Sequence, residues 1–205
     1  MSLESYNKVL DKTLRDIQKR KIDIVVIGAS LGGTIAIENL IKAISTKINV
    51  PIIIVQHMCK DMTIKFANRL DSINELNIVE VSDNERLVKG KVYIAKADYH
   101  LVISKKGIAS LNSEVVVNGV RPAVDNLFTS VAKTYKEKVL AIVLTGMGRD
   151  GAKGIIDISE AGGYCITQAE ESCFIYGMPK ACVETGVVNA VLPLEYIASI
   201  INLLV

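Results

Sequence analysis

Short, fully apolar segments alternate along the chain with longer segments in which apolar residues recur every three or four positions. The short segments are rich in β-branched residues and predict buried strands at residues 23–28, 51–55, 78–81, 139–144, 164–167 and 187–192. The longer segments predict helices at 34–45, 62–70, 121–135, 152–160 and 179–185, with a last helix from Pro193. Apolar strands that alternate with helices indicate an α/β protein: a doubly wound, mostly parallel sheet with helices on both faces.

Two regions depart from this alternation. Residues 1–21 carry apolar side chains at helical spacing from Leu3 to Ile17 and predict an amphipathic N-terminal helix. Residues 92–95, 100–103 and 109–111 are short apolar segments separated by turn-like sequences, and they predict an antiparallel hairpin excursion from the parallel core. We therefore expect an N-terminal helical or linker segment at 1–21 and a single domain at 22–205.

Composition excludes several classes of function. The 205 residues have a net charge of +2 and no long run of like charge, so nothing indicates a nucleic-acid surface. The chain has no apolar run of the length that spans a membrane. The charged N-terminal segment has no signal-peptide core, which predicts a cytoplasmic protein.

Cysteine spacing gives no sign of a metal or disulfide framework. Cys59, Cys165, Cys173 and Cys182 form no C-x-x-C pair, and three of them lie in apolar or nearly apolar surroundings. We expect buried free thiols and predict no metal and no cofactor.

A glycine-rich turn carries the first candidate for chemistry. Residues 28–33 read Gly-Ala-Ser-Leu-Gly-Gly between a predicted strand and a predicted helix, which matches the G-x-S-x-G nucleophile elbow. Such a turn holds Ser30 at its tip beside the N–H groups of a helix N-terminus, where negative charge on a reacting oxygen is stabilised. Two alternatives are a phosphate-binding turn and a glycine-rich connection without chemistry. The phosphate alternative is weakened because Ser30 takes the central glycine position of G-x-G-x-x-G.

Histidine is scarce, which narrows the choice of a general base to His57 or His100. His57 follows the second predicted strand, and the carboxyl ends of parallel strands meet at one edge of a sheet, where active sites form. We therefore expect His57 to lie near Ser30. His100 lies inside the predicted antiparallel excursion and is expected to be structural.

Asp150 completes a candidate triad. Residues 144–151 read Leu-Thr-Gly-Met-Gly-Arg-Asp-Gly and join a predicted strand to a predicted helix. An aspartate there can accept a hydrogen bond from His57 and stabilise the imidazolium. The alternative is that Asp150 only caps the helix that follows it.

Six sequence blocks together resemble the catalytic domain of the chemotaxis methylesterase family CheB, from about Ile22 to Val205. The resemblance rests on residues 27–33 (IGASLGG), 56–58 (QHM), 99–101 (YHL), 121–125 (RPAVD), 144–151 (LTGMGRDG) and 176–179 (YGMP). It implies a doubly wound α/β fold and a serine hydrolase that demethylates glutamate γ-methyl esters on the cytoplasmic helices of chemoreceptors, releasing methanol. Some members also deamidate receptor glutamines.

The same resemblance implies roles for individual residues. The nucleophile, base and acid of the family fall on Ser30, His57 and Asp150, and an oxyanion donor falls on the Met147 N–H. We add the Leu31 N–H as a second donor, because it belongs to the turn that carries Ser30. Leu31 stands where the family often has threonine, so any contribution of that hydroxyl is lost.

The family usually has a receiver domain before the catalytic domain. Residues 1–21 would then be linker sequence, or the chain would be a stand-alone enzyme; phosphorylation control is not predicted for it. Two other functions stay open on sequence grounds. One is a nucleotide-dependent oxidoreductase that uses the turn at Gly28–Gly33, and the other is a receptor-binding module without catalysis.

Overall fold

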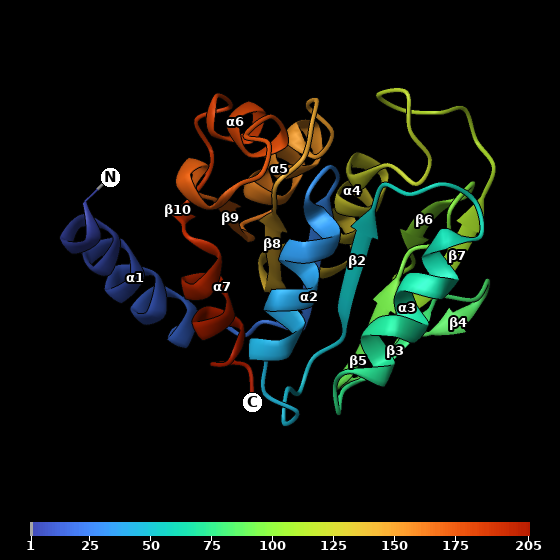
Figure 1. The fold of residues 1–205 in the computed structure, drawn as a ribbon, viewed down its shortest axis with the longest axis horizontal. Helices are drawn as coiled ribbons and strands as arrows, with labels where there is room; N and C mark the ends of the chain where they lie inside the picture. The colour runs from blue at the N-terminus through green and yellow to red at the C-terminus, as the bar shows by residue number, and fades with distance from the viewer. Residues whose placement is uncertain (1) are drawn as a thin grey trace.

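The central element is a seven-stranded sheet with the strand order β10-β9-β8-β1-β2-β5-β3, seen in a computed structural model that describes residues 2–205 (Figure 1). Every neighbouring pair in this sheet is parallel. The strands are β1 (Ile24–Ala29), β2 (Ile52–Gln56), β3 (Asn77–Glu80), β5 (Lys91–Ile94), β8 (Val139–Val143), β9 (Tyr164–Gln168) and β10 (Ala190–Leu192). The parallel α/β sheet predicted from the alternation of segments is confirmed.

Helices cover both faces of the sheet (Figure 1). One face packs against α1 (Leu3–Gln18), α2 (Gly33–Ala43), α3 (Met62–Ser72) and α7 (Leu194–Ile201). The other packs against α4 (Val124–Tyr135), α5 (Ala152–Glu160) and α6 (Met178–Val183). Successive residues of β1 alternate between the two cores, with Val25 and Ile27 in the first and Ile24 and Val26 in the second. A strand buried on both sides is apolar at every position, which explains its sequence.

A second, three-stranded antiparallel sheet lies beside α4, with the order β4-β7-β6. Its strands are β4 (Glu85–Arg86), β6 (His100–Ile103) and β7 (Ile108–Asn112). The predicted hairpin at 100–111 is therefore confirmed. The prediction that residues 92–95 belong to it is wrong, because β5 pairs in parallel with β2 and β3 in the central sheet. Its side chains alternate between the two cores like those of β1, and its short length concealed this.

Helix α1 packs on the outer edge of the sheet, beside α7 and β10 (Figure 1). Tyr6 and Ile17 from this helix are buried and belong to the same core as α2 and α3. Two short 3-10 helices, Lys136–Lys138 and Glu170–Ser172, complete the described elements. Across residues 2–205, none of the helices has the length and apolar character needed to cross a membrane.

Candidate active site at the carboxyl edge of the sheet

Ser30 lies on the sharp turn between β1 and α2. Its N–H donates to the Thr145 carbonyl oxygen over 3.0 Å, and its own carbonyl accepts from Gly33 N–H at 2.8 Å. The Gln56 side-chain amide donates to the same carbonyl at 2.9 Å. Gly32 has a φ of 81°, and a Cβ added to Gly33 would lie 2.8 Å from the Ala29 Cβ, which cannot rotate away. Both positions therefore require glycine, and the turn fixes the peptide that carries the serine.

His57 lies directly beside Ser30 because β1 and β2 are parallel neighbours. Ala29 is paired with Gln56 in the register of the two strands, so the next position along each strand is Ser30 on one and His57 on the other. The His57 N–H donates to the Ala29 carbonyl oxygen over 3.1 Å, which continues the ladder by one residue. The expectation that these two residues share one edge of the sheet is confirmed.

Asp150 reaches the same edge from the loop between β8 and α5. Its Oδ2 atom is 2.8 Å from Nε2 of His57, and the side chain of Asp150 is 3% exposed. The same oxygen accepts the Val124 N–H at 2.7 Å, and Oδ1 accepts the Asp125 N–H at 3.1 Å. The carboxylate therefore binds both the histidine and the N-terminus of α4, where the helix dipole favours negative charge.

The contact between Asp150 and the start of α4 bears on two expectations from the sequence. One is the residue at which α4 begins, and the other is the alternative that Asp150 caps α5. The helix predicted from residue 121 begins at Val124, and its N-cap residue Ala123 makes no side-chain capping bond. Asp150, far away in the sequence, satisfies the free N–H groups instead. The alternative that Asp150 is the N-cap of α5 is wrong, since Gly151 with a φ of 95° holds that position.

A second carboxylate and an amide support Asp150. Asn118 donates from Nδ2 to Asp150 Oδ1 at 3.0 Å and to Asp125 Oδ2 at 2.8 Å. The other oxygen of Asp125 accepts the N–H groups of Gly151 and Gly154 at 3.0 and 2.8 Å. Asp125 thereby fixes the start of α5 and the loop that carries Asp150. Sequence reasoning singled out neither Asn118 nor this role of Asp125.

The two carboxylates differ in their ionisation. Burial acts to raise the pKa of Asp150, but the hydrogen bonds from His57, Val124 N–H and Asp125 N–H outweigh it and lower that pKa. The pKa of Asp125 is raised, chiefly by burial and further by the charge of Asp150, against the hydrogen bonds that it accepts. Asp150 is therefore the carboxylate held as an anion next to the histidine.

The ring nitrogens of His57 take different roles. Since ionised Asp150 can only accept, Nε2 carries the proton in their hydrogen bond, and this assigns the lone pair to Nδ1. Among residues 2–205, no hydrogen bond joins Ser30 and His57. Hydrogen bonds between a nucleophile and its base are often long before substrate binds.

The loop after β8 also approaches Ser30. A Cβ added to Gly146 would lie 2.7 Å from the Ser30 Cβ, so glycine allows this close contact. Gly146 is held by its N–H bond to the Ile175 carbonyl oxygen at 3.0 Å. Within the described chain, the Leu31 and Met147 N–H groups donate to no protein acceptor. Both N–H groups are therefore available to an acceptor from outside the chain.

The other histidine lies outside this site. His100 is fully buried, its Nδ1 accepts the Ala123 N–H at 3.2 Å, and its Nε2 donates to the Val115 carbonyl oxygen at 3.1 Å. It therefore joins β6 to the loop that carries Asn118, which is the expected structural role. All four cysteines are free thiols.

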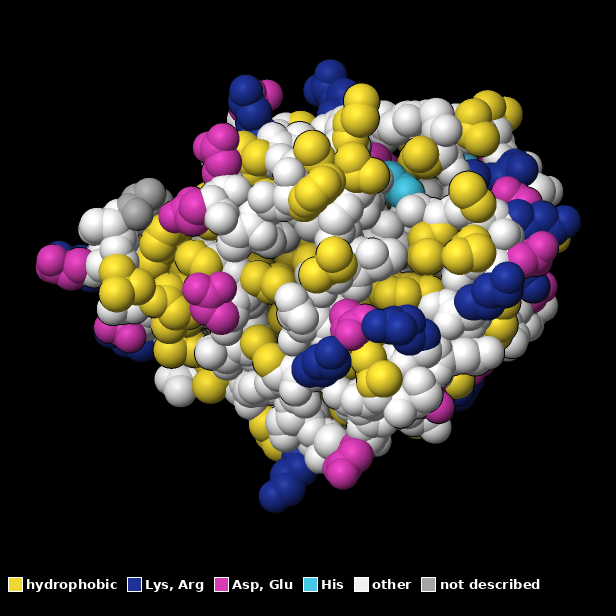
Figure 2. All heavy atoms as spheres, in the orientation of Figure 1, with side chains coloured by type: hydrophobic (Ala, Val, Ile, Leu, Met, Phe, Trp, Pro, Cys, Tyr) yellow, Lys and Arg dark blue, Asp and Glu magenta, His cyan; other side chains and the backbone are white. Residues whose placement is uncertain are grey.

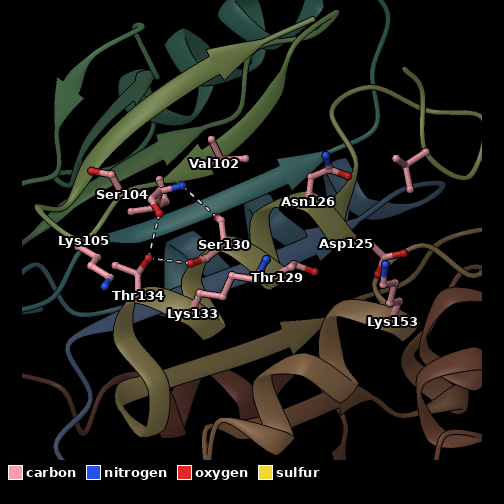
Figure 3. Close-up of a pocket in the computed structure, with 12 residues that line it drawn as sticks. Val102, Ser104, Lys105, Asp125, Asn126, Thr129, Ser130, Lys133, Thr134 and Lys153 are labelled. Atoms are coloured by element: carbon pink, nitrogen blue, oxygen red, sulfur yellow. Dashed lines mark hydrogen bonds between the residues drawn. The ribbon is translucent and has the colours of Figure 1, made fainter. Parts of the chain in front are cut away.

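A separate groove of about 550 Å³ lies between β6, α4 and α5 (Figure 3). Lys105, Lys133 and Lys153 stand on its rim. Two of its hydroxyl groups bond to the neighbouring strand, since Ser130 accepts the Ile103 N–H at 3.0 Å and Thr134 donates to the Ile103 carbonyl oxygen at 3.0 Å. These bonds fasten the small sheet to α4. Ser30 and His57 are absent from the lining of this groove.

Comparisons with known proteins agree with the geometry. The model of the CheB methylesterase family matches residues 25–201. A protein-glutamate methylesterase/protein-glutamine glutaminase of Clostridium acetobutylicum is 41% identical over 192 residues, covering 94% of this chain and 56% of that protein. A relative of the same name from Thermotoga maritima is 41% identical over 83% of this chain and 50% of its own length.

A solved structure supports the same relationship. The crystal structure of the Thermotoga maritima CheB methylesterase catalytic domain matches with a TM-score of 0.86 and 39% identity. The match covers 91% of this chain and all of that domain. By contrast, the chain spans only about half the length of the curated relatives it matches. These relatives support the hydrolase interpretation and not the nucleotide-binding one.

Proposed function

Because the chain belongs to the CheB methylesterase family, we propose that it is a serine hydrolase that cleaves glutamate γ-methyl esters on the cytoplasmic helices of chemoreceptors. Its place of action would be the cytoplasm. Residues 22–205 would be the catalytic domain, and residues 1–21 an N-terminal helical or linker segment. The observation that carries the proposal is the 2.8 Å bond between His57 and Asp150, formed beside Ser30 on the neighbouring strand.

The first half of the reaction forms an acyl-enzyme. Ser30 Oγ attacks the ester carbonyl carbon while Nδ1 of His57 takes the hydroxyl proton, and the carbonyl oxygen becomes an oxyanion. The Leu31 and Met147 N–H groups are the proposed donors to that oxyanion. The bond to the methoxy oxygen then breaks, His57 protonates the leaving oxygen, and methanol departs. Asp150 stabilises the imidazolium throughout.

Water completes the cycle. It loses a proton to Nδ1 of His57 and attacks the acyl carbon, the bond to Ser30 Oγ breaks, and the serine regains its proton. The product is a glutamate carboxylate. The same steps on a glutamine side chain would release ammonia in place of methanol. The relatives named protein-glutamine glutaminase support this second substrate.

Methanol release from methylated receptor membranes tests the proposal. We expect Ser30→Ala to lower turnover by a factor on the order of 10⁴ or more, because triad residues act as a unit. Wild-type protein should also react with a fluorophosphonate probe, and Ser30→Ala should not. The matched control is Ser82→Ala, an exposed serine outside the site, which should keep wild-type turnover and labelling. Demethylation at the wild-type rate by Ser30→Ala would reject the assignment.

A further inference from the structure

A groove of about 330 Å³ lies between α2 and α3, and none of the residues that line it takes part in the reaction above. Its apolar lining comes from Ile35, Met58, Met62 and Phe66. Met58 follows His57 in the sequence, and Ile35 lies in the first turn of the helix after Ser30. The groove therefore begins at the edge of the catalytic centre and leads away from it along two helices. We call it the α2–α3 groove.

The apolar surface of this groove is exposed. The side chain of Ile35 is 68% exposed and that of Met62 is 42% exposed. Leu31 and Phe174, also exposed, extend the apolar surface to the turn that carries Ser30. Figure 2 shows hydrophobic side chains gathered around a histidine on this face and continuing over α2 and α3. Contiguous exposed apolar surface of this kind marks a site of interaction, whereas isolated apolar residues do not.

Positive charge flanks the groove. Glu38 accepts hydrogen bonds from Lys42 at 2.8 Å and from Arg69 at 2.9 and 3.1 Å, which braces α2 against α3. Lys65 also lines the groove, and it forms no ion pair or side-chain hydrogen bond with any other described residue. The lining itself therefore carries two cations, Lys65 and Arg69, against the one carboxylate of Glu38. An occupant with negative charge is favoured over a neutral or basic one.

We propose that the α2–α3 groove docks an acidic amphipathic helix of the substrate protein. The apolar stripe of that helix would lie on Ile35 and Met62, and its carboxylates would face Lys65. A groove between two helices suits a helical ligand, and methionine side chains adapt to different contacts. The inference rests on the proposed function, and the acidic character of the occupant follows from the net positive charge of the groove lining.

The first test compares two substrates of one enzyme. Ile35→Asp is assayed on methylated receptor membranes and on p-nitrophenyl acetate, a small ester that needs no docking surface. We expect the ratio of kcat/KM on membranes to kcat/KM on the small ester to fall at least about tenfold, mainly through KM. Val88→Asp places the same charge at an exposed apolar residue outside the groove, and it should keep the wild-type ratio.

The second test reverses the charge. Lys65→Glu should lower kcat/KM on receptor membranes about tenfold and weaken its dependence on salt, because exposed charges are screened by ions. Lys106→Glu, which lies outside the groove, is the matched control and should change neither quantity. Equal salt dependence in wild type and Lys65→Glu would contradict the proposed acidic partner.

The remaining outcomes separate the docking proposal from the proposed function. If Ser30→Ala is inactive while Ile35→Asp keeps the wild-type ratio, docking in the groove is rejected and the hydrolase function stands. If Ile35→Asp changes only self-association in sedimentation experiments, the groove is an interface between copies and the docking proposal is again rejected. If Ser30→Ala still demethylates, the proposed function itself fails.

Discussion

The two sides of the proposed catalytic centre are built differently. On the acid side, the buried carboxylate of Asp150 accepts five hydrogen bonds, from His57, Asn118, Val124, Asp125 and Gly151. On the nucleophile side, the residues that flank the serine are open to solvent, with Leu31 51% and Met147 73% exposed. The acid side is therefore fixed before substrate arrives, while the nucleophile side is left for the substrate to cover.

This difference follows from what each side must do. An anion needs fixed donors and exclusion of water to hold the imidazole in one tautomer, and buried hydrogen-bond networks supply both. An oxyanion exists only during the reaction, so its donors must be unpaired beforehand. A protein substrate also needs accessible apolar surface near the serine. Substitutions on the two sides should therefore have different effects on stability and on activity.

The largest expected effect comes from Asp150. In Asp150→Asn the side-chain amide can place an N–H toward His57 Nε2, which disturbs the tautomer, and kcat should fall by a factor on the order of 10⁴. Asp150→Ala also removes the acceptor for the N–H groups of Val124 and Asp125, and the free energy of unfolding should fall by about 2–4 kcal/mol. Turnover assays and urea unfolding measure these two quantities. Asp150→Asn with activity within tenfold of wild type would contradict the assigned role.

A smaller effect is expected from Asn118, whose φ of 54° lies in the left-handed region. Asn118→Gly tolerates that backbone but loses both amide bonds, so we expect kcat to fall about tenfold and the unfolding free energy to fall by about 1–2 kcal/mol. Asn118→Ala should lose about 1 kcal/mol more stability from backbone strain, with no further loss in kcat. If kcat is also lower in Asn118→Ala than in Asn118→Gly, in proportion to the loss of stability, then Asn118 does not position Asp150.

The smallest effect is the pH dependence of stability. The lowered pKa of Asp150 stabilises the folded state above the unfolded pKa of about 4, and this contribution is lost as pH falls through the folded pKa. The difference in unfolding free energy between wild type and Asp150→Asn should therefore shrink under acid conditions. The raised pKa of Asp125 predicts the opposite trend. The unfolding free energy that Asp125→Asn loses relative to wild type should therefore grow as pH falls. Urea titrations between pH 7 and 3 measure the stability loss of each variant. If both losses change with pH in the same direction, the two carboxylates do not differ in ionisation as assigned.

The location of the candidate residues at one edge of the sheet could be predicted from sequence, because it depends on a simple rule. Apolar segments buried on both faces identify the parallel strands, and parallel strands bring their carboxyl ends to one edge. Ser30 and His57 each follow such a segment, and so does the loop to Asp150. The sequence has only two histidines, so there were few candidates for the general base. The position of His57 beside Ser30 is therefore a consequence of the β1–β2 register.

The acid side was less predictable because its contacts join distant segments. Asn118 lies in an Asn-Gly turn, which a sequence reader recognises as a turn, but its bond to Asp150 spans 32 residues. The capping of α4 by Asp150 likewise depends on the packing of two loops. The error at β5 has a related cause, since a four-residue segment fits a hairpin or a buried strand equally well until its neighbours are known.

The anchoring of Asp150 by the start of α4 bears on how inactive relatives should be recognised. A descendant that loses the nucleophile still needs the carboxylate to satisfy the helix N-terminus. Selection for a folded chain alone would thus preserve the aspartate long after catalysis had ceased. An aspartate at this position is therefore a poor marker of an active enzyme, and the serine and histidine are the residues to inspect.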